Sequence, residues 1–331
     1  MPGIASELKP GCRILKQRSE PAGVILKRPI LIAGPTASGK SALAVWLAKA
    51  CGGAVINADS MQVYDVLQVL SARPGAEEAD AVPHHLFGHV DPREAYSVAR
   101  WLEDVRPLLE DFGRRGVRPV FAGGTGLYFK ALLEGLSQVP PVDPEIRQSL
   151  REAAETDLAG LYGALEQADP ESWRRIRPGD SQRIVRALEV VQSSGKPLSW
   201  WQAQDGGTGL FSGADCIRLV LEPGRAELRA RIAARFAAMM EEGAIDETRA
   251  LLALDIPRDK PAMRAIGVRE IAAFLDGHLS REAAIGKAVT ATAQYAKRQS
   301  TWFRNQFGDD WFRAGDGDAA YAEISRQLGA E

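Results

Sequence analysis

The sequence predicts an α/β fold in which helices flank a parallel sheet and an all-helical subdomain is inserted into the chain. Short apolar runs alternate with segments of helical periodicity, as in parallel sheets covered on both faces. The first run leads directly into GPTASGKS at residues 34–41, which has the G-x-x-x-x-G-K-S spacing of a phosphate-binding loop (P-loop). Two breaks rich in proline and glycine, at 140–144 and 205–209, enclose a stretch without a strand candidate. Together these observations favour a P-loop NTPase-like core with an insertion.

Four apolar runs are the strand candidates of the core. They occupy about residues 29–33, 54–58, 119–122 and 216–221. Strong helix formers fill residues 41–50, and a glycine pair ends that helix. Apolar residues from Trp101 to Phe112 recur at helical spacing, and Pro107 is expected to kink the helix that they form. After the fourth run, from Arg225 onward, the pattern is mostly helical.

The breaks divide the chain into three predicted parts. Residues 1–28 form a basic N-terminal extension, which we expect to be poorly ordered. It lacks the apolar segment of a secretory signal, and a basic transit peptide is the alternative, although no clear amphipathic helix is present. Residues 29–141 and 206–331 form the catalytic core, and residues 142–205 form the helical insertion.

Composition excludes several classes of protein. The chain has 331 residues, 45% of them apolar, and a net charge of −2, so it has no global basic field. A local basic patch could still bind nucleic acid. Cys12, Cys51 and Cys216 form no C-x-x-C pair and fit a reducing cytosol. No apolar stretch approaches the roughly 20 residues that span a membrane, and we expect a cytoplasmic monomer.

The P-loop is the most specific single motif. Its backbone amides would form an anion-binding nest at the start of a helix. Lys40 would place a positive charge on the terminal phosphates, and the Ser41 hydroxyl would bind Mg²⁺. The predicted phosphate-binding residues are Gly34, Pro35, Thr36, Ala37, Ser38, Gly39, Lys40 and Ser41.

Asp59 and Thr125 follow the second and third predicted strands. Loops at the carboxyl ends of parallel strands carry the ligands of open α/β sheets, so both residues are expected near the P-loop. Asp59 could bind Mg²⁺ through water or accept a proton from a nucleophile, although it could also cap a turn with Ser60. Thr125 lies in the glycine-rich segment GGTG, which suits close approach to a ligand and equally suits a tight turn.

Two basic stretches are candidates for nucleic-acid contacts. Residues 172–186 hold five arginines and one aspartate, and Arg183 and Arg186 share a helix face beside Gln182. A solvated helix face explains this cluster equally well. The acid-free stretch 287–304 interleaves aromatic and basic residues, a pattern that an ordinary amphipathic helix explains better than RNA binding. A third cluster, His84, His85 and His89, suits packing better than metal binding, because adjacent residues seldom reach one ion.

Three functional hypotheses compete for the P-loop. A small-molecule or nucleoside kinase would use Asp59 as base or Mg²⁺ ligand and the arginines at 174–177 as a lid. A GTPase-like switch would need a guanine-reading N-K-x-D motif, which the sequence lacks. A transferase could use the loop to hold the diphosphate leaving group of its donor. The kinase hypothesis gives no role to the GGTG segment or to the arginine-bearing insertion.

Several segments in a fixed order support the third hypothesis. They are GPTASGKS (34–41), NADSMQVY (57–64), PHHL (83–86), AGGTGLYFKALLEGL (122–136), DSQRIVRALEV (180–190), LEPGRAELRARIAARFAAMMEEG (221–243), AIGVRE (265–270) and QYAKRQSTWFR (294–304). Together they resemble the tRNA dimethylallyltransferase family over roughly residues 29–310. Three places depart from the family pattern: DVLQVLSAR at 65–73, Val268 in place of tyrosine, and Ala293 in place of arginine.

The resemblance implies a reaction and its substrates. A dimethylallyl group would pass from dimethylallyl diphosphate to N6 of the adenosine 3′-adjacent to the anticodon, in tRNAs that read UNN codons. The product would be i6A, with release of diphosphate and with Mg²⁺ as cofactor. The resemblance gives Lys40 and the P-loop to the leaving group, Asp59 the role of base, and Thr125 the positioning of adenine or donor. A P-loop kinase remains the alternative.

The resemblance also implies contacts with the anticodon stem-loop of tRNA. The residues expected to make them are Asp59, Ser60, Met61, Gln62, Thr125, Arg147, Gln182, Arg183, Ile184, Val185 and Arg186. Reaching a loop adenine requires its extrusion into the cleft, at a cost of a few kcal/mol.

Overall fold

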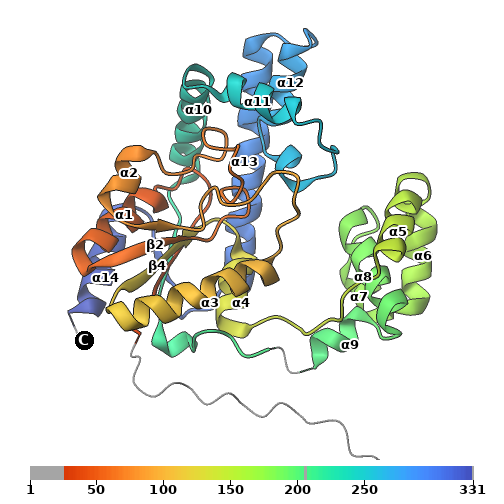
Figure 1. The fold of residues 1–331 in the computed structure, drawn as a ribbon, viewed down its shortest axis with the longest axis horizontal. Coiled ribbons are helices and arrows are strands. Elements are labelled where there is room, and N and C mark those ends of the chain that lie inside the picture. The colour runs from red at the N-terminus through yellow and green to blue at the C-terminus, as the bar shows by residue number, and fades with distance from the viewer. Residues whose placement is uncertain (1–25, 205–206, 330–331) are drawn as a thin grey trace, which may run out of the picture.

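A computed structural model describes residues 26–204 and 207–329, and its core is a six-stranded parallel sheet (Figure 1). The strand order is β3-β2-β4-β1-β5-β6. The strands are β1 (Ile30–Ala33), β2 (Gly53–Asn57), β3 (His84–His85), β4 (Arg118–Gly123), β5 (Ile217–Leu221) and β6 (Phe312–Ala314). The α/β fold class with a helical insertion is therefore confirmed. The sequence did not predict β3 and β6, which are too short to form an apolar run.

Helices cover both faces of the sheet. Alternate residues of a strand point to opposite faces, so Leu31 packs on one side and Ile32 on the other. The first face packs against α3 (Val98–Arg115), α4 (Gly126–Glu134) and the end of α13 (Arg281–Gln306). The second packs against α1 (Lys40–Cys51) and α14 (Gly317–Leu328), with α2 (Ala76–Ala81) beside α1. Burial of the strands on both faces explains their apolar sequences.

Helix α3 continues through Pro107 as one element. The kink that the sequence predicts at this proline stays a prediction, since a kinked helix can be continuous. A proline removes one backbone donor and crowds the preceding turn, yet the apolar face of α3, with Trp101 and Val105 fully buried, stays packed on the sheet. Tertiary packing therefore keeps the helix continuous.

The insertion is a bundle of helices with its own core (Figure 1). Its helices are α5 (Pro144–Thr156), α6 (Leu158–Ala168), α7 (Pro170–Arg175), α8 (Ser181–Ser194) and α9 (Leu198–Ala203). Buried Asp169 joins α7 to α9, because its carboxylate accepts hydrogen bonds from Ser172 and from Ser199. Most of the predicted N-terminal extension, up to residue 25, lies outside the described residues, as does Cys12.

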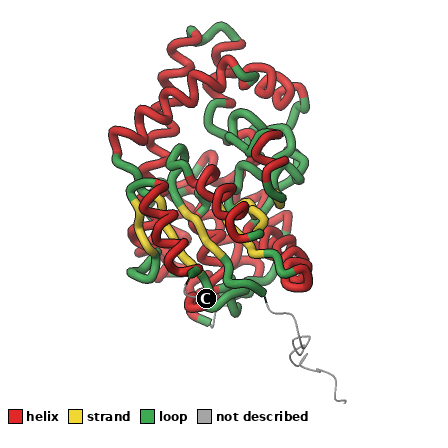
Figure 2. Tube along the Cα trace, turned by 90° about the vertical axis from the view of Figure 1, so that its left-hand side faces the viewer, coloured by secondary structure: helices red, strands yellow, loops and turns green. Residues whose placement is uncertain are grey.

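A second group of helices rises above the carboxyl ends of the strands, and Figure 2 shows it in side view above the yellow strands. It comprises α10 (Arg225–Glu241), α11 (Ala244–Ala253), α12 (Val268–Leu275) and the long α13, with short 3₁₀ turns η1 (Gly213–Asp215) and η2 (Pro261–Arg264). Leu228 and Ile232 of α10 pack on Ala296 of α13. No helix within residues 26–204 and 207–329 is long and apolar enough to cross a membrane.

Candidate active site

A cavity of about 470 Å³ opens at the carboxyl ends of the central strands. Its walls come from the P-loop, the segment 59–72, the faces of α10 and α13, the turn at η2, and one insertion residue, Gln182. Ligand sites of parallel sheets are expected at this edge. The volume is within the range of small-molecule sites.

The P-loop has the backbone conformation that a phosphate nest requires. Gly39 and Ala37 both have left-handed backbone, with φ of 95° and 62°. Gly34 packs tightly on β5, because a Cβ there would lie 2.9 Å from the carbonyl oxygen of Leu221. Thr36 and Ala37 line the cavity, and α1 begins at Lys40, so the positive end of the helix dipole faces the loop.

Lys40 is the cation of this loop, and its Nζ donates to the carbonyl oxygen of Pro35 at 3.3 Å. Burial lowers the pKa of Lys40 to about 8; the charge of Asp59 opposes this shift and that of Arg235 adds to it. Lys40 and Asp59 therefore lie close enough to interact, as the sequence predicted from their positions after neighbouring strands. An anionic ligand would favour the charged ammonium further.

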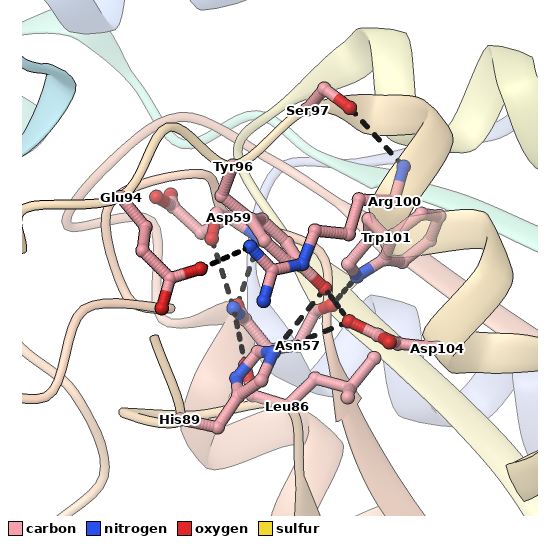
Figure 3. Close-up of polar contacts among 10 residues, drawn as sticks. All are labelled: Asn57, Asp59, Leu86, His89, Glu94, Tyr96, Ser97, Arg100, Trp101 and Asp104. Carbon is pink, nitrogen blue, oxygen red and sulfur yellow. Dashed lines mark hydrogen bonds and ion pairs between the residues drawn. The ribbon is translucent and has the colours of Figure 1, made fainter. Parts of the chain in front are cut away.

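Asp59 is held by the fully buried side chain of Asn57 (Figure 3). The Asn57 carboxamide accepts from the Asp59 backbone N–H at 2.8 Å and donates to the backbone oxygens of Asp59 and Leu86 at 2.9 and 3.0 Å. The indole of Trp101 donates to the Asn57 backbone oxygen at 2.8 Å. One Asp59 oxygen, Oδ1, accepts from the Met61 N–H at 2.9 Å, and the carboxylate lines the cavity. Asp59 thus both caps a turn and faces the cavity.

The three histidines of the sequence cluster, His84, His85 and His89, pack outside the cavity. His89 Nε2 lies 3.2 Å from the Tyr96 hydroxyl, which donates to Asp104 of α3 (Figure 3). His84 Nδ1 bonds to the backbone oxygen of Val82, and the His85 ring packs edge-on against Phe112. These contacts fit the packing role expected from the sequence.

The GGTG segment is a close-approach loop. A Cβ at Gly123 would lie 2.0 Å from the backbone oxygen of Ala58. The Thr125 N–H donates to that same oxygen, and the Thr125 hydroxyl accepts from the Ser60 N–H at 3.0 Å. Ser60 lines the cavity, whereas Thr125 lies behind it. The loop therefore fixes the position of the segment that carries Asp59.

Replacing Gly123 by alanine should destabilise the protein by about 1–3 kcal/mol, because the new methyl group meets backbone rather than a movable side chain. The matched control is Gly163→Ala in α6, where a Cβ meets nothing within 4 Å, and it should be neutral or stabilising by up to ~1 kcal/mol. Urea denaturation of both variants checks this. Wild-type stability of Gly123→Ala would refute the close-approach interpretation.

The structure separates the predicted RNA-contact residues into groups. Asp59, Ser60, Met61 and Gln182 line the cavity. The Gln62 side-chain amide instead donates to the backbone oxygens of Ser71 and Ala72, so it shapes the 65–74 turn.

On the insertion, Arg183 is exposed and pairs with Asp180. Arg147 and Arg186 both pair with buried Glu189, at 3.5 and 3.4 Å. The two guanidinium groups therefore lie close to each other. The side chains of Ile184 and Val185 are buried in the insertion core. Buried side chains do not reach RNA, so the structure does not support side-chain contacts from these two residues. Within α8, Ile184 and Val185 face the insertion core, whereas Arg183 and Arg186 face solvent.

Several polar residues of the site were not predicted from the sequence, among them Arg235, Tyr295, Arg298 and Gln299. Arg235 lies in the cavity wall on α10, and burial lowers its pKa while the charge of Glu78 opposes the shift. Tyr295 and Arg298 line the cavity from α13, and Gln299 lies behind them, joined to two loops of the site. A signal was present, because Arg235 shares a helical stripe with Ile232, Phe236 and Met239, where an apolar residue would be expected.

The departures at 65–73 form an ordered turn. The Glu247 carboxylate of α11 accepts from the backbone N–H groups of Gln68, Val69 and Leu70. Leu70 lines the cavity together with Phe236. The Cδ2 atom of Leu70 packs against Gly267, where an added Cβ would lie only 2.7 Å away. Val268 is buried beneath this turn. Of residues 65–73, Leu70, Ser71 and Ala72 form part of the cavity wall.

Comparison with known proteins places the chain in a family. A family model described as IPP transferase matches residues 62–306, and a second, described as isopentenyl transferase, matches residues 28–84. The chain belongs to the IPP transferase family. It is therefore an enzyme of the prenyltransferase class, and the resemblance inferred from sequence motifs is confirmed.

Relatives and solved structures of the family agree over most of the chain. The tRNA dimethylallyltransferase of Chelativorans sp. is 53% identical over 290 residues, covering 87% of this chain and 98% of the relative. That of Rhizobium meliloti is 50% identical, covering 88% and 96%. The full-length tRNA isopentenylpyrophosphate transferase of Bacillus halodurans superposes with a TM-score of 0.65 at 34% identity, covering 92% and 96%. A eukaryotic dimethylallyltransferase captured acting on tRNA gives 0.72 at 31% identity, covering 84% and 70%.

Proposed function

We propose that this enzyme transfers the dimethylallyl group of dimethylallyl diphosphate to N6 of the adenosine 3′-adjacent to the anticodon, in tRNAs that read UNN codons. The products are i6A and diphosphate. The observation that carries the proposal is one cavity into which both a phosphate-binding loop and the Asp59 carboxylate open. The names of the relatives, and a neighbour captured on tRNA, support the choice of donor and acceptor.

The donor end of the reaction needs a stabilised leaving group. The bond between the allylic carbon and the diphosphate oxygen breaks, and its electron pair leaves with the diphosphate. The P-loop and Arg235 line the cavity, and Lys40 lies close enough to Asp59 and Arg235 to interact with both. The P-loop amides and these two cations are the groups that would bind the developing charge. The apolar side chains of Ile232, Phe236 and Met239 offer a wall for the hydrocarbon and exclude water from the allylic carbon.

The acceptor end needs a base. The N6 lone pair forms the new carbon–nitrogen bond, and the nitrogen then releases a proton. Asp59 is the carboxylate of the cavity wall that lies close to the P-loop cation, so it is our candidate to take that proton. Asn57 and Met61 hold it in place before substrates arrive.

Magnesium is also part of the proposal. The Ser41 hydroxyl is an oxygen ligand of the kind that Mg²⁺ prefers, and the ion would reach Asp59 only through water. Within residues 26–204 and 207–329 no group of three or more His, Cys, Asp or Glu could hold an ion. This donor set fits an ion held mainly by diphosphate and water, which would supply positive charge to the leaving group.

The insertion and the long helix α13 are the proposed RNA contacts. Gln182 reaches the cavity from α8, and Arg298 reaches it from α13. The cluster of Arg147, Arg183 and Arg186 lies on the same bundle as Gln182 and suits phosphates of the anticodon stem-loop. The target adenine would be extruded into the cavity between these elements.

The decisive experiment incubates the protein and Mg²⁺ with dimethylallyl diphosphate, labelled in its hydrocarbon, and an unmodified anticodon stem-loop. Label on the adenosine 3′-adjacent to the anticodon is the expected result, and nuclease digestion with mass spectrometry locates it. Stem-loops from UNN-reading and other tRNAs test selectivity. Phosphate transfer from ATP to a small acceptor, without label on RNA, would instead favour the kinase alternative.

Removing Arg183 and Arg186 together should weaken stem-loop binding and reduce its salt dependence. Each lost phosphate contact lowers the slope of log K against log salt by about 0.7–0.9, so the double alanine variant should lose about 1.4–1.8 from the slope. Arg147 remains paired with Glu189, so no buried carboxylate is left alone. Arg326→Ala on α14, an exposed arginine paired with Glu323, is the control. An unchanged slope would make the cluster a solvated face.

A further inference from the structure

We propose that Gln299 is a positioning residue that ties the diphosphate-binding loop to the loop beneath the acceptor site, so that binding of donor and of RNA are coupled. The inference rests on the proposed function, because it concerns the two substrates of that reaction. Gln299 is 5% exposed on α13, and its side chain reaches two loops that are far apart in sequence.

The two hydrogen bonds of Gln299 fix its carboxamide. Its Oε1 accepts from the backbone N–H of Thr36 at 2.9 Å, and its Nε2 donates to the backbone oxygen of Gly124 at 2.9 Å. The orientation of the amide is unambiguous, since a backbone N–H needs an acceptor and a backbone carbonyl needs a donor. One planar group therefore sets the distance between the P-loop and the GGTG loop.

Each partner is adjacent to a group of the site. Thr36 lies in the cavity wall, two residues after Gly34. Gly124 precedes Thr125, whose hydroxyl holds the Ser60 N–H next to Asp59. A displacement of the P-loop by an arriving diphosphate is thus transmitted through Gln299 to the backbone that supports the base.

The tight packing around Gly124 holds the Gln299 carboxamide in place. A Cβ on Gly124 would lie 2.1 Å from Nε2 of Gln299 and 3.2 Å from Oδ2 of Asp59. Carboxamide and carboxylate therefore both lie next to the space that a side chain at position 124 would fill. Tyr295, one turn earlier on α13, lines the cavity, and burial together with the Asp59 charge raises its pKa, against the effect of a hydrogen bond with Gln299.

The alternative role for Gln299 is purely structural, as a satisfied polar group between helix and loops. That role predicts a less stable variant whose folded fraction turns over normally. The positioning role predicts a slower chemical step in folded protein, because small displacements of reacting groups cost up to about 100-fold in rate. The two roles are separable by rate measurements on folded protein.

The experiment compares wild type with Gln299→Met, which keeps the volume and loses the hydrogen bonds to both loops, and Gln299→Glu, which keeps only the acceptor. Gln294→Met, on an exposed position of the same helix, is the matched control. Single-turnover transfer with both substrates saturating should fall about 10- to 100-fold in both Gln299 variants and stay unchanged in the control. The affinity for inorganic diphosphate, measured with and without stem-loop, should differ in wild type and become nearly equal in Gln299→Met.

A double substitution distinguishes the proposed role of Gln299 from a simple loss of folded protein. Gly124→Ala should displace the Gln299 amide and impair transfer, and Gln299→Ala should make room for the added methyl group. The methyl group still lies 3.2 Å from Oδ2 of Asp59. The double variant should therefore be slowed by less than the product of the two single effects. Wild-type rate and diphosphate coupling in folded Gln299→Met, or simple additivity in the double variant, would overturn the role. Absence of label transfer by wild type would instead reject the proposed function.

Discussion

Replacing Asp59 by asparagine should slow transfer from bound substrates by about 10²- to 10⁴-fold, the usual contribution of a positioned general base. The change is nearly isosteric, and the asparagine oxygen can still accept the Met61 N–H, so the turn should persist. Stem-loop affinity should change little, since the insertion and α13 are untouched. Single-turnover rates with prebound stem-loop, together with a binding titration, measure the two quantities separately.

Asp80→Asn in α2 is the control for loss of one exposed carboxylate, and it should transfer at the wild-type rate. Near-normal turnover of Asp59→Asn would remove Asp59 as the base. A parallel loss of RNA affinity would point to a binding role for the same carboxylate.

The same substitution should also act on Lys40. The charge of Asp59 holds the pKa of Lys40 higher than burial alone would leave it. Without that charge the pKa falls below about 8, and the ammonium is lost at lower pH. Donor affinity of Asp59→Asn should therefore begin to decline at a lower pH than in wild type.

How far the sequence predicts the fold depends on the length of each element. The four predicted strands are apolar runs of four to six residues, and the structure contains all four within a residue or two. Strand β3 has two residues and β6 has three, and each joins the sheet at its edge, where the apolar signal is weak. Their pairing is a consequence of the sheet already formed, which no local pattern reveals.

The site divides in the same way. Lys40, Asp59 and the P-loop were predictable, because each follows a recognisable strand and parallel strands bring their ends together. The roles of Gln299 and Arg235 were not predictable, although Arg235 interrupts an apolar helical stripe. Their partners lie more than a hundred residues away along the chain and depend on how α10 and α13 pack over the sheet. Ile184 is the opposite case, a predicted contact that the fold does not support. Its motif was interpreted as one continuous contact segment, but the helical period of α8 places the Ile184 side chain on the buried face.

Replacing Lys40 by methionine should lower kcat/KM for the donor by about 10²- to 10³-fold, as expected for loss of one preorganised group that binds developing negative charge. Methionine fills the partly buried space without a charge, so the P-loop should keep its form. Stem-loop binding without donor should remain close to wild type. Equal turnover of Lys40→Met and wild type would show that the amides and Arg235 bind the leaving group unaided.

The pH dependence of the wild-type enzyme tests the role of Lys40 without a substitution at that position. Only the ammonium form of Lys40 attracts diphosphate, and in the free enzyme this form predominates below its pKa of about 8. Since kcat/KM reports ionisations of the free enzyme, wild-type kcat/KM for the donor should fall about tenfold per pH unit above pH 8. Arginine stays charged throughout this range, so Lys40→Arg should be slower overall yet lack the alkaline decline. A decline that persists in Lys40→Arg would assign it to another group.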